Sequence, residues 1–369
     1  MRRKTAGGPK AAAKELAGWD DTASMGFEEV SERYGRAIDE KLREVLEASV
    51  VVARSYHPLI GRMYDTLMEY TLRKGRRLAA SSTLVTYEGY TGRIDDGIVR
   101  VGCGIEIYRH AILVHDDLVD ADPVRRGGRT FHKLMESGYD ERFGSGAAVF
   151  AGNVMYSLAL QTVLSSGFDP GKLTKVLEMM AVEYRNVNES QVLDLEFEYR
   201  DPDVSEWTVM ASKRATTLFR ATLGIGAVLA GADEGELQIL SAAGEHIGYA
   251  FDIQDDIIDT FASAEQYGRP PGADILRGKR PLHLVLALQK DERLATEFRD
   301  VMTGKQQLDI ESIRKSVSET GALEEAKKIS REHADAGIRL ISETAMRDES
   351  KQFFVSFIEY VKDSLEWYK

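Results

Sequence analysis

Apolar residues at three- and four-residue spacing recur along almost the whole chain and constrain its fold more than any other feature. This spacing puts apolar side chains on one face of an α-helix, and it is clearest in residues 27–48, 173–199 and 237–261. No alternating segment of convincing length predicts a β-strand. Only eight prolines interrupt the 369 residues. We therefore expect an all-α protein with roughly ten or more helices.

The predicted breaks between helices are short. Clusters of Asp, Gly, Pro and Ser mark loops at residues 120–128, 165–171, 200–205 and 267–274. None of them has the length or composition of an interdomain linker. We predict one large helical domain, residues 26–369, preceded by a flexible tail, residues 1–25. The tail is basic but lacks the apolar core of a signal peptide.

Charge and cysteine content narrow the class of partner. The net charge is −12, which disfavours general attraction to nucleic acid or to an anionic membrane but leaves room for a local basic site. The only cysteine, Cys103, excludes a disulfide framework and suits a reducing cytoplasm. No stretch reaches the roughly 18 apolar residues of a membrane span. We expect a cytoplasmic protein with no nucleic-acid partner and no transmembrane segment.

One short pattern occurs twice, as "VHDDLVD" (114–120) and "IQDDIID" (253–259). Each copy ends a strongly apolar predicted helix. Because helix positions i and i+4 share a face and i+1 lies beside them, the carboxylates of each copy should gather into one cluster. The members of the two clusters are Asp116, Asp117 and Asp120 in the first, and Asp255, Asp256 and Asp259, extended one turn back by Asp252, in the second.

A solvated acidic face is the plainest explanation of one such cluster. It fits poorly here, because the helices that present the carboxylates are otherwise apolar, and burying unpaired charge is costly. Two clusters of oxygen ligands indicate cations held between them, and Mg²⁺ is typically held by carboxylates and substrate phosphates together. A di-iron site, the all-α alternative, needs Glu-x-x-His pairs. None of the seven histidines has a glutamate three residues before it.

Basic residues accompany both clusters. Arginine forks suit phosphate oxygens, although each of these residues alone would be an ordinary surface charge. Together with two magnesium-type clusters they predict a substrate that carries diphosphate groups. The basic positions are Arg73 to Arg77, Arg125, Arg126 and Arg129 in a loop with Gly127 and Gly128, Lys213, Arg214, Lys279 and Arg280.

From about residue 60 to 290, the sequence resembles the polyprenyl (isoprenoid) diphosphate synthase family, in particular its geranylgeranyl diphosphate synthases. A single DDxxD motif is a weak signal, but two of them with a following RRG loop and a late lysine loop, in this order, are a strong one. The matching positions are Asp116, Asp117, Asp120, Arg125, Arg126 and Gly127; Gln191 and Asp194 of "SQVLDLEF"; Asp255, Asp256 and Asp259; and Asp274, Gly278 and Lys279 of "GADILRGKRP".

The resemblance implies the all-α isoprenoid synthase (trans-prenyltransferase) fold with a central cavity, usually as a homodimer. It implies head-to-tail condensation of an allylic diphosphate with isopentenyl diphosphate, using about three Mg²⁺ ions with substrate bound. The released diphosphate would act as the base, so that His115 and His132 shape the cavity rim instead. The implied residues are Asp116, Asp117, Asp120, Asp255, Asp256, Lys213 and Arg214 for catalysis; the six motif aspartates, including Asp259, for metal; and Arg76, Arg109, Arg125, Arg126, Gln191, Asp194 and Lys279 for substrate.

Departures from the family pattern gather where isopentenyl diphosphate should bind. Arg76 stands where lysine is usual, and Ala79 where a second arginine is usual. Arg109 replaces a histidine or glutamine seven residues before the first motif. We hypothesise that Arg109 supplies the charge lost at Ala79, which requires Arg109→Gln to raise the KM for isopentenyl diphosphate. Further on, the family's Lys-Thr pair becomes Arg214-Ala215, and the glutamine of its FQxxDD motif becomes Asp252.

These departures leave two alternatives open. One is a terpene synthase-like enzyme that ionises a single prenyl diphosphate. The other is a non-catalytic subunit of a heteromeric synthase. The intact second DDxxD motif and RRG loop argue against a dead subunit, and the retained Arg76, Arg126 and Lys279 favour elongation over cyclisation.

Product length should depend on the helix that carries the first motif. The positions four, five and eight residues before Asp116 are Ile112, Ala111 and Tyr108. Bulk five residues before the motif stops growth early in short-chain relatives, and Ala111 is small. Tyr108 lies three residues further down the helix, about 4.5 Å away. We predict geranylgeranyl diphosphate (C20) or a longer product with Tyr108 as the floor, although a core-packing role for Tyr108 is equally compatible with the sequence.

Overall fold

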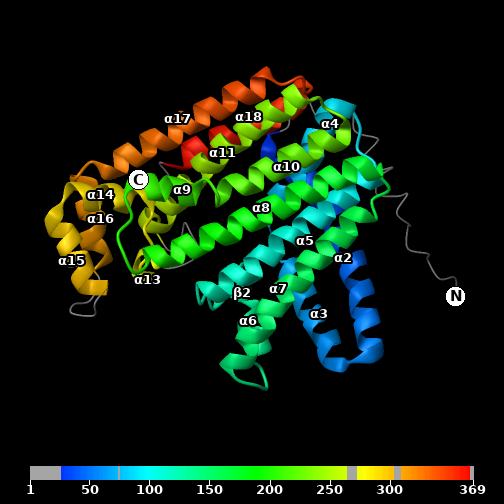
Figure 1. Ribbon diagram of the computed structural model, residues 1–369, viewed down its shortest axis with the longest axis horizontal. Helices are drawn as coiled ribbons and strands as arrows, with labels where there is room; N and C mark the ends of the chain where they lie inside the picture. Colours follow the sequence, from blue (N-terminus) through cyan, green and yellow to red (C-terminus); the bar gives the residue numbers. More distant parts are fainter. Residues whose placement is uncertain (1–25, 74, 264–271, 303–308, 366–369) are drawn as a thin grey trace. The chain divides into compact units, whose positions relative to one another are not determined.

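The computed structural model describes residues 26–73, 75–263, 272–302 and 309–365, and almost all of this part of the chain is helical (Figure 1). Its two strands, β1 (Val124–Arg125) and β2 (Gly128–Arg129), form one antiparallel pair. The all-α prediction is therefore confirmed. The helices are α2 (Phe27–Tyr56), α3 (Pro58–Thr71), α4 (Leu78–Thr91), α5 (Asp96–Val119), α6 (Phe131–Met135), α7 (Glu141–Leu164), α8 (Pro170–Phe197), α9 (Val204–Ala211), α10 (Ala215–Ala230), α11 (Glu234–Phe261), α13 (Ala273–Arg277), α14 (Leu282–Lys290), α15 (Glu292–Met302), α16 (Ile310–Glu319), α17 (Ala322–Glu343) and α18 (Asp348–Ser364).

Aspartate caps fix where several long helices begin. Asp95 accepts the backbone N–H of the third residue of α5, and Asp140 and Asp233 do the same for α7 and α11. An N-cap carboxylate pairs with a backbone donor that has no partner inside the helix, which contributes about 1 kcal/mol. Residues 165–169 and 200–203 of the predicted breaks lie between helices as expected, whereas the last two residues of each break already belong to α8 and α9. The predicted tail, and residues 264–271 of the region around the fourth break, lie outside the described residues.

The chain forms two compact units. The first comprises the described residues of Met1–Leu177, Ile225–Ala232 and Met346–Phe353, and the second those of Glu178–Gly224, Asp233–Ala345 and Phe354–Lys369. The predicted single domain of residues 26–369 stays a prediction.

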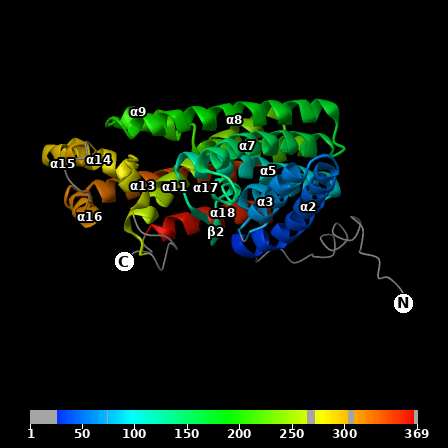
Figure 2. The same ribbon diagram turned by 90° about the horizontal axis from the view of Figure 1, so that it is seen from below.

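In the first unit, α5 lies alongside α7, as both views show (Figures 1 and 2). A glycine makes the close approach possible. A Cβ added at Gly104 of α5 would lie 3.1 Å from the carbonyl oxygen of Ala159 on α7 and 2.6 Å from a methyl group of Val163. Any larger residue at this position would therefore separate the two helices.

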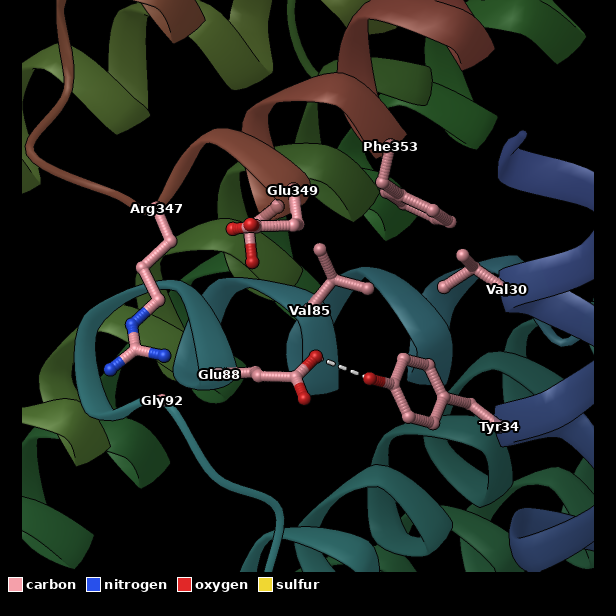
Figure 3. Close-up of a pocket in the computed structure, with 9 residues that line it drawn as sticks. Val30, Tyr34, Val85, Glu88, Gly92, Arg347, Glu349 and Phe353 are labelled. Carbon is pink, nitrogen blue, oxygen red and sulfur yellow. Dashed lines mark hydrogen bonds between the residues drawn. The ribbon is translucent and has the colours of Figure 1, made fainter. Parts of the chain in front are cut away.

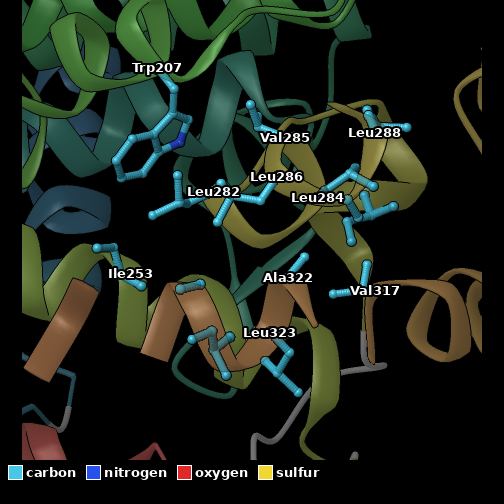
Figure 4. Packing of buried hydrophobic residues seen from close by; sticks show 14 of the residues in the cluster. Trp207, Ile253, Leu282, Leu284, Val285, Leu286, Leu288, Val317, Ala322 and Leu323 are labelled. Carbon is cyan, nitrogen blue, oxygen red and sulfur yellow. The ribbon is translucent and has the colours of Figure 1, made fainter. Parts of the chain in front are cut away.

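In the second unit, α11 lies alongside α17, and a large apolar core joins α9, α11, α14 and α17 (Figure 4). Trp207, Ile253, Leu282 and Leu323 are among its buried side chains. Each fully buried side chain of this size contributes roughly 1.5–3 kcal/mol. This core holds one face of α11 in place, and the same helix carries the second aspartate pattern.

One helix in the described part of the chain, α7, is long and apolar enough to cross a membrane by length and composition alone. The core helices of globular proteins often meet the same test, and α7 packs against α5 and α6.

Candidate active site

The loop after the first aspartate pattern is a tight hairpin. Its two central residues, Arg126 and Gly127, have φ angles of 51° and 76°, which is the signature of a type I′ turn. Arg73 fastens the hairpin, because its guanidinium donates to the carbonyl oxygens of Arg125 at 3.0 Å and Arg129 at 2.8 Å. Arg73 was a phosphate-binding candidate in the sequence, and in the structure its guanidinium stabilises the hairpin.

The first aspartate cluster lies at the C-terminal end of α5, as predicted. Asp116 and Asp117 are in its last turn, and Asp120 is its C-cap. Arg125 binds both carboxylates, through Nε to Asp117 and through Nη2 to Asp116 at 3.2 Å. Tyr70 of α3 donates its hydroxyl to Asp117 at 2.6 Å. Sequence reasoning missed Tyr70, and no sequence signal connects it to a residue on another helix.

Burial dominates the electrostatics of this cluster. It raises the pKa of Asp117, and the positive charge of Arg125 opposes the rise. Burial also raises the pKa of Tyr70 well above its usual range, so this phenol remains a donor. The carboxylate oxygens are the ligand type that Mg²⁺ prefers. Among the described residues, no three carboxylate, thiol or imidazole groups are already arranged as metal ligands.

Two neighbouring arginines have different surroundings. The Arg76 side chain is half exposed and pairs with Glu28 at 3.2 Å. The Arg77 side chain is 1% exposed, and it pairs with Asp39 at 2.7 Å and Glu106 at 3.4 Å. The sequence grouped both arginines as phosphate-binding candidates, but Arg77 instead forms a buried ion-pair network.

This network continues along α5. Glu106 is fully buried, and nearby His110, Arg109 and Arg77 oppose the burial, so its pKa is lowered. His110 donates from Nδ1 to the Glu106 carbonyl at 2.7 Å, and its Nε2 lies 3.4 Å from Arg126 Nη1. Burial lowers the pKa of His110 to about 3, which keeps this imidazole neutral.

The same region carries excess positive charge. Burial, with Arg109 and Arg77 nearby, lowers the pKa of Arg126 to about 10. Such a cluster is suited to an anion. Arg109 and Arg126 were predicted from the sequence, whereas Glu106 and His110 were not. Their i,i+4 spacing inside an apolar helical run was the available signal. The proposed compensation between Arg109 and the buried Ala79 stays a prediction.

The second aspartate cluster is also bound by an arginine. Arg214 lies in the break between α9 and α10, and its guanidinium donates to Asp252 at 2.8–3.1 Å and to Asp256 at 3.2 Å. It also pairs with Asp194 of α8 at 3.6 Å, and Lys279 pairs with the same carboxylate at 3.3 Å. Four predicted residues, Arg214, Asp256, Asp194 and Lys279, are therefore brought together.

A small cavity of about 30 Å³ opens among these groups. Asp259 and Asp274 also line it, and the Asp274 backbone N–H lies 3.3 Å from an Asp259 carboxylate oxygen. Asp255 is the exposed member of the motif. The volume admits one or two water-sized groups. The oxygen-rich lining again fits a hard divalent cation.

Three further predicted side chains have other surroundings. Lys213 binds Glu189 at 2.6 Å and Asn186 at 3.2 Å. Gln191 is half-buried on α8. Near the first cluster, His115 Nε2 bonds to the Val149 carbonyl at 3.0 Å. Their roles stay predictions, as does that of His132, which is buried.

The proposed chain-length residues lie on α5 beside α7. Tyr108 is 2% exposed, and its ring centroid lies 6.1 Å from that of Tyr156 on α7. Ala111 is fully buried and Ile112 is half-buried. Tyr156 was not foreseen, and its ring adds bulk at the level of Tyr108.

A separate cavity of about 60 Å³ lies in the first unit between α2, α4 and the start of α18 (Figure 3). Tyr34 donates a hydrogen bond to Glu88 across it, and Arg347 and Phe353 line its other side. None of the predicted site residues lines this cavity.

Comparison with known proteins identifies the family of this chain. The model of the family described as polyprenyl synthetase matches residues 61–320. The chain therefore belongs to the polyprenyl synthetase family, and it is a prenyltransferase. Among its curated relatives, the short chain isoprenyl diphosphate synthase of Methanocaldococcus jannaschii is 30% identical over 257 residues, covering 69% of this chain and 75% of the relative.

Other relatives cover more of the chain. The geranylgeranyl pyrophosphate synthase of Geoglobus acetivorans is 27% identical over 334 residues, which is 90% of this chain and 98% of the relative. A solved structure of the synthetase from that archaeon has a TM-score of 0.73 at 26% identity, covering 91% and 98% of the two chains. A Corynebacterium glutamicum geranylgeranyl pyrophosphate synthase, solved with isoprenyl diphosphate and magnesium, has a TM-score of 0.83 at 20% identity, covering 92% and 100%. These structures confirm the isoprenoid synthase fold.

Proposed function

We propose that this prenyltransferase condenses isopentenyl diphosphate head-to-tail with an allylic diphosphate and releases geranylgeranyl diphosphate or a longer product. The observation that carries the proposal is that the buried aspartates of each cluster are held by an arginine in a family whose relatives are prenyl diphosphate synthases. The donor set of each cluster supports Mg²⁺ as the cation, with about three ions in the substrate complex. Bound Mg²⁺ would stabilise the negative charge that develops on the leaving diphosphate.

The residues of the first cluster would prepare this chemistry. Arg125 holds Asp116 and Asp117, and Tyr70 fixes the second of these carboxylates. When the carboxylates bind a cation, the Arg125 guanidinium becomes available to phosphate oxygens. Asp120, at the end of α5, would complete the metal-binding set.

The residues of the second cluster would act in a similar way. Asp255, Asp256 and Asp259 would bind metal, while Lys213, Arg214 and Lys279 would bind the allylic diphosphate. Gln191 and Asp194 belong to the same predicted substrate-binding set.

The positive region near Glu106 supports a second anion-binding place. Arg76, Arg109 and Arg126 would bind isopentenyl diphosphate there, because Arg77 is already committed to buried partners. The pocket would thus retain three arginines in spite of its departures from the family pattern. These retained arginines favour elongation over cyclisation.

Incubation of the pure protein with Mg²⁺, isopentenyl diphosphate and dimethylallyl, geranyl or farnesyl diphosphate tests the proposal. We expect prenyl diphosphates of C20 or longer, and no product when EDTA removes the metal. A hydrocarbon or alcohol from the allylic substrate alone would instead identify a terpene synthase-like enzyme. No turnover with any primer would indicate a non-catalytic subunit.

The exposed face of α7 supports the proposed homodimer. Val149, Phe150 and Leu164 are 44%, 69% and 52% exposed although they are large and apolar. Apolar side chains grouped on one helix are typical of a protein interface. We further propose a cytoplasmic location, which suits the single buried thiol of Cys103.

Tyr108→Ala is expected to lengthen the product by at least one isoprene unit, because it removes a buried ring from the helix along which the prenyl tail should grow. Chromatography of the dephosphorylated products measures the change. Tyr108→Phe is the matched control and should leave the length unchanged, since the ring remains. An unchanged product with Tyr108→Ala would assign this residue to core packing.

A further inference from the structure

Asp252 is a carboxylate of α11 that lies outside both DDxxD motifs. Asp252 is buried and lies one helical turn before Asp256, so both side chains lie on the same face of α11. Arg214 connects them. Its Nε lies 2.9 and 3.1 Å from the two oxygens of Asp252, and its Nη2 lies 2.8 Å from one of them. This is a fork-type pair of the strong, geometrically specific kind.

The remaining donors of Arg214 point to residues with proposed roles. Nη2 also lies 3.2 Å from Asp256, and Nη1 lies 3.6 Å from Asp194. A guanidinium has five N–H donors, and the fork to Asp252 uses only its Nε side. The other donors can therefore change partners while the fork stays intact.

We propose that Asp252 is a positioning residue that holds Arg214 in place when Asp256 turns from Arg214 to a metal ion. Without this anchor, Arg214 would lose a main partner on metal binding, and its long side chain would regain rotamer freedom. With the anchor, Nη1 and the second N–H of Nη2 remain directed to the place where a diphosphate group binds. This inference rests on the proposed function of the second aspartate cluster.

Two departures from the family pattern meet in this pair. Lysine is usual at position 214 and glutamine at position 252, so a cation beside a neutral amide is replaced by an ion pair. The two residues are 38 positions apart in the sequence but share a hydrogen-bonded fork. The aspartate at position 252 therefore pairs with the arginine at position 214, and the effects of substitutions at these two positions are expected to be non-additive.

Binding of inorganic diphosphate at saturating Mg²⁺, measured by calorimetry, tests the proposal without turnover. Asp252→Gln is expected to weaken binding about tenfold, a coupling typical of residues in direct contact. The direction of the change in diphosphate affinity is informative, because removing the negative charge of Asp252 near an anion would by itself strengthen binding. In an Arg214→Gln background, Asp252→Gln should change the affinity less than about threefold, since Asp252 acts through Arg214.

Glu183→Gln is the matched control. Glu183 is also buried and pairs with an arginine of α10, Arg220, at 3.0 Å, but neither residue lines the cavity of the second cluster. Glu183→Gln should lower the free energy of unfolding without changing diphosphate affinity more than about twofold. Equal effects of Asp252→Gln with and without Arg214, tighter binding, or no change would overturn the proposal. Failure of the proposed function would appear separately, as wild-type protein that forms no elongated product.

Discussion

Asp117→Asn is expected to lower kcat/KM about a thousandfold, the scale seen when one group that stabilises developing charge is lost. Asp117 is the fully buried carboxylate of the first cluster, and it accepts from Tyr70 and Arg125. An amide keeps the shape but loses the negative charge that a hard cation needs. The NH₂ group of the new amide would also point at another hydrogen-bond donor, either the Tyr70 hydroxyl or the Arg125 guanidinium, and one hydrogen bond would be lost. Initial rates at saturating Mg²⁺ measure the loss.

Asp122→Asn provides the control for this experiment. Asp122 is also buried, and its carboxylate lies 3.9 Å from Arg125, but it is outside the DDxxD motif. It should retain activity within about tenfold of wild type, and both variants should keep the far-ultraviolet circular dichroism of a helical protein. Equal losses of activity in both variants would mean that the reaction depends on the ion pairs of Arg125 and not on the negative charge of the motif carboxylate.

Local patterns in the sequence predicted the elements that carry the site. The apolar spacing of residues 27–48, 173–199 and 237–261 predicted α2, α8 and α11, because helix periodicity depends only on near neighbours. The same rule placed the members of each aspartate cluster on one helical face. Both clusters lie at the predicted ends of apolar helices.

The partners of these residues could not be predicted in the same way. Tyr70 lies 47 positions from Asp117, and Arg214 lies 38 positions from Asp252. Such contacts depend on how helices pack, and a single sequence does not contain that information. The burial of Glu106 likewise depends on packing, because Arg77 and Arg126 from other segments join Arg109 and His110 of its own helix in opposing the cost of burial.

Arg76 and Arg77 illustrate the same limit most clearly, because they are identical neighbours in the sequence. Arg77 is the N-cap of α4 and has a left-handed backbone with a φ of 48°, whereas Arg76 remains exposed. The direction in which the chain enters α4 therefore decides which of the two is buried. No property of the residue type distinguishes them.

Arg77→Ala is expected to lower the free energy of unfolding by about 3–5 kcal/mol, because it leaves the buried Glu106 carboxylate without its guanidinium partner. Arg76→Ala is the matched control. It removes a half-exposed pair with Glu28 and should cost less than about 1 kcal/mol. Urea unfolding followed by circular dichroism measures both values.

The kinetic effects of the two substitutions should have the opposite order. Arg76→Ala should raise the KM for isopentenyl diphosphate, whereas Arg77→Ala, assayed below its unfolding temperature, should change KM less. The double variant Arg77→Met/Glu106→Leu should recover much of the lost stability, because apolar side chains of similar volume can replace a buried ion pair. If Arg77→Ala instead raised KM with no loss of stability, Arg77 would bind substrate, and the buried network would not be its main role.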